Sequence, residues 1–122
     1  MIPRVLVCDD TKFMRMMIVS ILSGAGIEVV GEAENDIEAI DQYKKLGPDV
    51  VTLEMEIPEI GGIDTLRGIL QHDESARVIM CAVTGQGELI SEAEQLGAKV
   101  LLKPFASEGL VSLVNEVFVS HP

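Results

Sequence analysis

The sequence is poor in basic residues and in cysteine. It contains 9 lysines and arginines against 20 aspartates and glutamates, so its formal net charge is −11. Such a surplus of negative charge disfavours nucleic acid and anionic membrane surfaces as partners, and leaves cationic protein patches and metal ions. With 2 cysteines in the chain, we expect a reduced, cytoplasmic protein rather than a disulfide-bonded secreted one.

Long apolar runs, leader-like segments and linkers are also missing. No stretch is long enough for a membrane span, and Met1 leads directly into a strand-like segment. The sequence has no internal repeat, no low-complexity tract and no linker that would separate a second domain. We therefore expect one domain over residues 1–122, without membrane insertion and without nucleic-acid binding.

Several common cofactor motifs are absent as well. His72 and His121 have no companions at metal-ligand spacing, and there is no phosphate-binding P-loop. The glycines near residues 24–31 follow an expected helix and precede an expected strand, which is the wrong context for a dinucleotide-binding loop. These absences remove nucleotide-dependent chemistry from the leading hypotheses.

What the sequence does contain is a regular alternation of two patterns. Near-continuous apolar runs predict strands at residues 4–8, 27–30, 49–54, 77–83 and 99–102. Helical apolar spacing follows each of these runs, and the last helix carries Leu110, Leu113, Val114 and Val117 on its buried face. Short connections and apolar strands favour an α/β fold, in which a parallel sheet is covered by helices on both faces.

The same spacing predicts which side chains face the core and which residues cap the helices. Phe13 and Met14 belong to the apolar series of the first helix, and Ile37 belongs to that of the second. Thr11 is expected to cap the first helix, and either Asn35 or Asp36 the second.

Charged residues follow three of the predicted strands. Asp9 and Asp10, Glu54, and Lys103 each lie at the carboxyl end of a strand, where α/β sheets bind their ligands. Adjacent acids suit a hard cation such as Mg²⁺, and a lysine suits an anionic phosphoryl oxygen. Glu54 between them could accept a phosphoryl group, since carboxylates serve as nucleophiles. Metal and lysine would then offset the transferring charge.

Short motifs accompany these residues along the whole chain. They are Asp9-Asp10, Lys12-Phe13-Met14-Arg15, Gly31-Glu32-Ala33, Pro58 with Gly62, Gly97-Ala98, and Lys103-Pro104-Phe105. With them the chain resembles the receiver domains of response regulators, close to the single-domain CheY-like chemotaxis type. The resemblance implies a doubly wound (βα)5, flavodoxin-like three-layer sandwich with parallel strand order 2-1-3-4-5. It also implies a cis peptide bond before Pro104.

The resemblance further implies a role in two-component signal transduction rather than enzymatic turnover. Such domains receive a phosphoryl group from a histidine kinase and act on a downstream signalling, motor or adaptor protein. The implied Mg²⁺ ligands are Asp9, Asp10, Glu54 and the backbone carbonyl of Glu56. We expect Mg²⁺ binding to be weakened here, because the longer Glu54 reaches toward the metal position.

The implied partner surface consists of the fourth helix, the fifth strand and the fifth helix. Leu89, Val100 and Phe105 are the residues that we expect on it, and the protein is expected to be a monomer or a weak dimer. Because the implied strand order places the third strand between Cys8 and Cys81, these cysteines should lie about 9–10 Å apart, too far for a disulfide.

Three positions depart from the family pattern. Glu54 stands where the phosphoacceptor aspartate is expected, four residues before Pro58. Ala82 falls at the position of the Ser/Thr switch, although a gap would bring Thr84 there instead. Val100 replaces the switch aromatic, three residues before Lys103. The longer glutamate should be a poor phosphoryl acceptor, since productive attack needs an in-line oxygen within about 3–3.5 Å.

Three functions therefore remain open. The first is an atypical, phosphorylation-independent receiver (a pseudo-receiver) that signals by protein contact. The second is a working phospho-receiver in which Glu54 is a phosphomimetic replacement of aspartate, or is itself phosphorylated. The third and least favoured is a small phosphohydrolase, with Glu54 and Glu56 in the places of its two aspartates.

Overall fold

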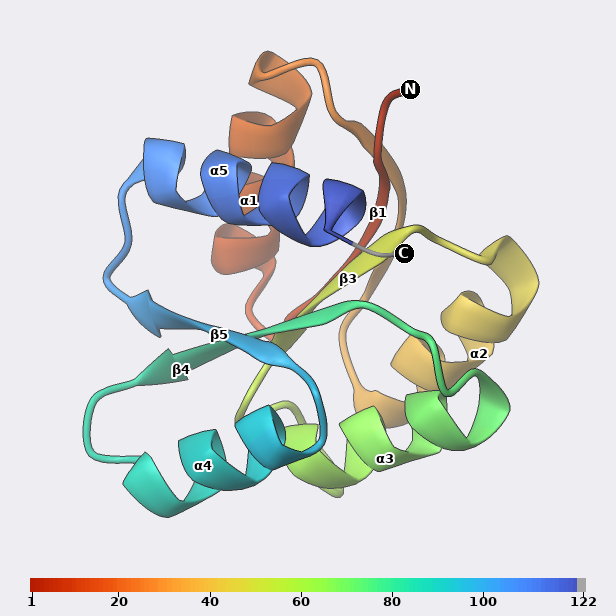
Figure 1. Cartoon of the computed structure of the whole chain (residues 1–122), viewed down its shortest axis with the longest axis vertical. Helices are drawn as coiled ribbons and strands as arrows, with labels where there is room; N and C mark the ends of the chain where they lie inside the picture. Colours follow the sequence, from red (N-terminus) through yellow and green to blue (C-terminus); the bar gives the residue numbers. More distant parts are fainter. Residues whose placement is uncertain (121–122) are drawn as a thin grey trace.

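The computed structural model describes residues 1–120, which form five strands alternating with five helices (Figure 1). The strands are β1 Arg4–Cys8, β2 Glu28–Ala33, β3 Val50–Glu54, β4 Val78–Val83 and β5 Lys99–Lys103. The helices are α1 Lys12–Gly24, α2 Asp36–Leu46, α3 Gly62–His72, α4 Gly87–Gln95 and α5 Ser107–Val119. The strands pair in parallel in the order β2-β1-β3-β4-β5, so the predicted doubly wound fold is confirmed.

Helices cover both faces of the sheet, which explains why the strands are so apolar. Helices α1 and α5 lie on one side, and α2, α3 and α4 on the other (Figure 1). Each side has its own buried cluster, centred on Ile18, Leu22 and Leu110 under α1 and α5, and on Leu53, Leu66 and Ile69 on the other side. Strand β3 lies between the two clusters and all of its residues are buried.

Local capping agrees with the predictions for α2 but not for α1. The Asn35 side chain accepts a hydrogen bond from the Glu38 amide at 2.9 Å, and Gly47 ends α2 in the left-handed conformation. Thr11 does precede α1, but its side chain makes no capping hydrogen bond. Its own amide instead donates to the Asp9 carboxylate at 2.8 Å, so Thr11 belongs to the strand-end loop.

Two predicted core residues are on the surface. Phe13 is 75% exposed and Ile37 is 72% exposed, so their assignment to buried faces was wrong. At 3.6 residues per turn, Phe13 lies about 140° around the helix from Ile18, and Ile37 about 160° from Ala39. Both are therefore outside the stripe that each helix buries.

Strand β2 is longer than its apolar run. It continues to Ala33, because it pairs along the whole of β1 as far as Cys8. Gly31 permits this continuation, since a Cβ atom there would come within 2.6 Å of the Leu46 side chain of α2. The sequence pattern stopped at Val30 because a close approach of this kind leaves no apolar signal.

Other expectations about the backbone hold. Cys8 and Cys81 are both unpaired and buried, on strands that β3 separates. The peptide bond between Lys103 and Pro104 is cis, as the resemblance implied. Within residues 1–120, none of the helices combines the length and the apolar character that crossing a bilayer requires.

Candidate functional site

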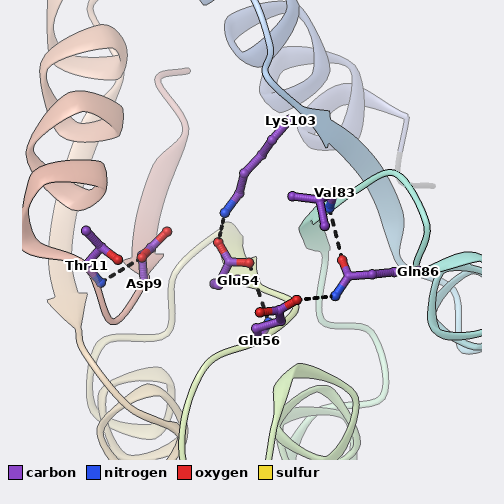
Figure 2. Close-up of polar contacts among 7 residues, drawn as sticks. All are labelled: Asp9, Thr11, Glu54, Glu56, Val83, Gln86 and Lys103. Atoms are coloured by element: carbon purple, nitrogen blue, oxygen red, sulfur yellow. Dashed lines mark hydrogen bonds and ion pairs between the residues drawn. The ribbon is translucent and has the colours of Figure 1, made fainter.

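The carboxyl ends of β1, β3 and β5 bring three charged side chains together (Figure 2). Glu54 is the last residue of β3, Lys103 is the last residue of β5, and Asp9 directly follows β1. The Lys103 Nζ donates to the Glu54 Oε2 in a close ion pair. Glu54 is 7% exposed, so this pair is largely removed from water.

Backbone amides contact the carboxylates of both Glu54 and Asp9. The Glu56 amide faces the Glu54 Oε1 at 3.5 Å, and the buried Asp9 carboxylate accepts from the Thr11 amide. The Arg15 Nη1 donates to the Asp9 carbonyl oxygen at 2.7 Å and so ties α1 to the end of β1. Asp10 differs from these groups because it is exposed.

Burial and charge act in opposite directions on the ion pair. Burial raises the pKa of Glu54, Lys103 offsets part of this rise through its hydrogen bond and charge, and Asp9 adds to the rise. For Lys103, burial lowers the pKa, but the hydrogen bond and the negative charges of Glu54 and Asp9 outweigh it, so the pKa is raised. The ammonium is therefore the firmly charged partner, and it depends on Glu54 for compensation.

The expected Mg²⁺ ligands are not gathered into a site. In the part of the chain that the structure describes, no three acidic, histidine or cysteine side chains lie close enough to hold a metal ion. The Lys103 ammonium takes one Glu54 oxygen, and the Thr11 amide takes one Asp9 oxygen. A lysine thus supplies the positive charge at this edge, and the residues as they lie do not fit Mg²⁺.

One side chain links this pocket to the start of α4. The Gln86 Nε2 donates to the Glu56 Oε1 at 2.7 Å, and its Oε1 accepts from the Val83 amide at 3.0 Å (Figure 2). Glu56 in turn contacts Glu54 through its amide. A continuous series of polar contacts therefore runs from Lys103 to the residue before α4. Gln86 was missed at the sequence level, since nothing local pairs it with Glu56, 30 residues away.

The structure also places the candidate residues for the Ser/Thr switch, Ala82 and Thr84, and for the switch aromatic, Val100. Ala82 is fully buried in β4, opposite Leu102, whereas Thr84 lies in the exposed turn that follows the strand. The structure thus puts Ala82, not Thr84, on the strand next to Glu54. Val100 is partly buried against the core cluster on the α4 side of the sheet.

The expected partner residues are exposed to different degrees. Leu89 is 39% exposed, but Val100 and Phe105 pack partly against the two core clusters. Two residues that were not predicted contribute more surface: Val83 is 41% exposed and Leu102 is 45% exposed. The position of Leu102 on the last strand, an expected edge of the sheet, was the signal that could have identified it.

Comparisons with known proteins agree with the geometry. Residues 5–115 match the response regulator receiver domain family. The chain is 44% identical over 115 residues to the chemotaxis protein CheY of Thermotoga maritima, covering 93% of this chain and 96% of that protein. It is 45% identical over 114 residues to CheY of Bacillus subtilis, covering 93% and 95%.

Solved structures show the same fold. The CheX–CheY–BeF3–Mg complex of Borrelia burgdorferi includes a chain with a TM-score of 0.89 and 31% identity, covering 95% of this chain and 89% of that one. The response regulator domain of Thermotoga maritima CheB has a TM-score of 0.89 and 32% identity, with 100% of both chains covered.

Proposed function

This chain belongs to the response-regulator receiver domain family, and we propose that it is a CheY-like receiver that signals by protein contact without phosphorylation. Domains of this family are two-component signalling modules rather than enzymes. The proposal treats residues 1–122 as one receiver domain, which acts from the cytoplasm as a monomer or a weak dimer.

The ion pair between Lys103 and Glu54 carries this proposal. An acceptor carboxylate must present a free oxygen in line with the donor phosphorus, at about 3–3.5 Å. Here one oxygen of Glu54 is bound to the Lys103 ammonium, and the other faces the Glu56 amide. Burial also raises the pKa of Glu54, which lowers the share of the nucleophilic carboxylate form.

The switch positions support the same function. Ala82 has no hydroxyl that could bond to a phosphoryl oxygen, and Val100 has no ring that could reorient. An Asp-to-Glu phosphomimetic replacement in an otherwise ordinary receiver would account for Glu54 but for neither of these residues. Positions 54, 82 and 100 thus lack the acceptor aspartate, the switch hydroxyl and the switch ring, respectively. All three losses are expected in a receiver that phosphorylation no longer controls.

The closed Glu54–Lys103 pair also bears on Mg²⁺ binding and on the choice of partners. We propose that Asp9, Asp10, Glu54 and the Glu56 carbonyl bind Mg²⁺ weakly or not at all, because Lys103 already compensates the pocket. The proposed output surface is made by α4, β5 and α5, and its partner is a downstream signalling, motor or adaptor protein. A histidine kinase remains a partner by contact, without productive phosphotransfer.

Intact-mass measurement after incubation with phosphoramidate and Mg²⁺ tests this function. The parent protein and the Glu54→Asp variant are compared, and Glu54→Asp combined with Ala82→Ser asks whether the missing hydroxyl matters. We expect no phosphate on the parent and a hydroxylamine-labile phosphate on the aspartate variants. Phosphate on none of the proteins would also support signalling without phosphorylation. Phosphate bound to Glu54 of the parent would overturn the proposal.

A further inference from the structure

A cavity opens at the amino end of the sheet, the end opposite to Glu54. It has a volume of about 280 Å³ and lies where β4 and β5 begin and α5 ends. Its lining comes from both sides of the sheet, since α4 and α5 cover opposite faces (Figure 1). Four apolar side chains, two buried and two half-buried, are part of it: Val78, Val117, Leu70 and Leu96. The cavity can therefore shelter a short hydrocarbon chain.

Two basic residues also line this cavity. Arg77 lies just before β4, and Lys99 is the first residue of β5. Lys99 is on the same side of β5 as Leu101, which packs in the cluster under α1 and α5. The guanidinium of Arg77 is on that side too, 6.0 Å from the centre of the Phe118 ring of α5. Both cations therefore leave their strands toward α5.

Neither cation is neutralised by an ion pair within residues 1–120. The Arg77 Nη1 donates to the Phe118 carbonyl oxygen at 3.2 Å, which leaves other N–H groups of its guanidinium for a ligand. Lys99 is exposed. One acid, the exposed Glu74, also lines the cavity. The lining thus carries net positive charge, in a molecule whose formal net charge is −11.

The carboxyl ends of α4 and α5 lie around the cavity, and their partial negative charge counts against the cations. The Glu94 carbonyl at the end of α4 already accepts from the Gly97 amide at 3.0 Å. The Phe118 carbonyl near the end of α5 is the one that Arg77 binds. Arg77 therefore has a structural task at α5, whereas no contact within residues 1–120 assigns one to Lys99.

We propose that this cavity binds a small carboxylic acid with a hydrocarbon chain of about four to seven carbons. Arg77 and Lys99 would hold the carboxylate, and the chain would lie against Val78 and Val117. The site is separate from the Glu54 pocket, so the inference goes beyond the proposed function and does not depend on it. Its occupant would contact the end of α4 and the start of β5, two elements of the proposed output surface.

Other ligands fit the cavity less well. Phosphate is typically held by the amides of a helix amino end or a glycine-rich loop, and here α4 and α5 present their carboxyl ends. A divalent cation needs several oxygen ligands and would meet one carboxylate and two cations. A neutral apolar molecule would leave both cations without a partner, so apolar shape alone does not account for the lining.

The test is an NMR titration of the full chain, in which amide shifts locate the binding and give Kd. Four probes are compared at neutral pH and about 0.15 M salt: hexanoate, acetate, hexanamide and inorganic phosphate. We expect hexanoate to shift the amides of Val78, Gly97 and Lys99 with a Kd on the order of 1 mM. The other three should bind at least about fivefold more weakly, because acetate and phosphate lack the chain and hexanamide lacks the charge.

Matched variants separate the cavity from net charge. Lys99→Gln should weaken hexanoate about fivefold and leave hexanamide unchanged. Lys45→Gln makes the same charge change on α2, where the side chain is 66% exposed, and should change Kd by less than about 1.5-fold. Arg77 is kept, because its bond to Phe118 also holds the end of α5. Both substituted side chains are exposed, so circular dichroism should show the parental fold.

Several results would overturn the inference. Acetate or hexanamide that binds as tightly as hexanoate would remove the need for the chain or for the charge. Equal effects of Lys99→Gln and Lys45→Gln would leave net charge as the cause. Shifts confined to residues around Lys103 would put the anion at the other end of the sheet, and no shift up to about 20 mM hexanoate would exclude the site. The phosphorylation measurement on Glu54 is independent of all of these.

Discussion

The two ends of the sheet satisfy their carboxylates in different ways. At the carboxyl end, Glu54 is buried against the Lys103 ammonium. At the amino end, Asp73 follows α3 and accepts from the Tyr43 hydroxyl at 2.7 Å and from the Ser75 amide and hydroxyl at 3.1 and 2.7 Å. One site pairs two charges out of water, and the other surrounds a partly exposed charge with neutral donors.

The pKa shifts show what each arrangement costs. Hydrogen bonds from Tyr43, and to a lesser extent from Ser75, lower the pKa of Asp73. The fold therefore stabilises the charged form of this carboxylate relative to water. Burial raises the pKa of Glu54 in spite of Lys103. The amino end thus stabilises the fold at little desolvation cost, whereas the carboxyl end keeps a costly pair that stability alone does not require. Such a cost is typical of a functional site.

The largest loss of stability is expected when the Lys103 ammonium is removed from the buried pair at the carboxyl end. Lys103→Met leaves Glu54 buried without its partner and should lower the free energy of unfolding by about 3 kcal/mol at neutral pH. Because the pKa of Glu54 is already raised, the penalty of its charged form is relieved as pH falls and the carboxyl takes up a proton. Urea unfolding at pH 7 and roughly pH 5 should therefore show a shrinking difference from the parent.

An exposed ion pair provides the control for this measurement. Lys45 and Asp41 lie one helical turn apart on α2, and their side chains are 66% and 55% exposed. Lys45→Met should change the free energy of unfolding by less than about 0.5 kcal/mol. If Lys103→Met lowered the free energy of unfolding as little as Lys45→Met does, the buried pair would contribute no more to stability than an exposed one.

At the amino end, Tyr43→Phe should have a smaller and differently pH-dependent effect. It removes the hydroxyl that donates to Asp73 and should cost about 1 kcal/mol at pH 7. A lowered pKa gives stability that is present above the unfolded value of 3.8 and is lost as pH falls through the folded value. Urea unfolding at decreasing pH should show the two proteins converging. A constant difference would mean that packing, not the hydrogen bond, is responsible.

Removing the Gln86 side chain, which links Glu56 to the start of α4, should change the structure's stability only locally. Gln86→Ala removes both the contact with Glu56 and the acceptor for the Val83 amide, and should cost less than about 1 kcal/mol overall. Amide hydrogen exchange at Val83 should nevertheless become faster. Gln86→Glu is the matched variant, since it keeps an acceptor for Val83 but places a like charge beside Glu56. Unchanged exchange at Val83 in Gln86→Ala would argue against the link.

The smallest effect is expected from Mg²⁺. Because Lys103 occupies the position of the compensating charge, millimolar Mg²⁺ should raise the thermal midpoint of the parent by less than about 1 °C, and a chelator should not lower it. Glu54→Asp, with its shorter side chain, should respond more. A rise of several degrees in the parent would show that its acids do gather around the metal.

Much of the fold was predictable because it depends on patterns that neighbours along the chain share. Strand β3 is buried on both faces, and its apolar run is visible in the sequence. Phe13 and Ile37 are exposed, and their assignment to the core was wrong because apolar residue type alone does not say which side of a helix faces the sheet. That side is set by how α1 and α2 pack against the strands.

The site was predictable as a set of positions but not as a set of contacts. The carboxyl ends of parallel strands meet at one edge of the sheet, which is enough to predict from the sequence that Asp9, Glu54 and Lys103 lie together. This convergence does not say which oxygen Lys103 takes, nor that Gln86 reaches Glu56. Those contacts depend on side-chain rotamers and on the turns after β3 and β4.

By itself, the sequence determined the class of the fold, the convergence of three charged residues and the net charge of the molecule. It did so because strand burial, helical spacing and charge depend on residue type and on order along the chain. The tertiary structure alone decided that Lys103 closes the pocket on Glu54 and that Gln86, just before α4, reaches Glu56. Both depend on distances between elements that are remote in the chain, which packing sets and local pattern does not encode.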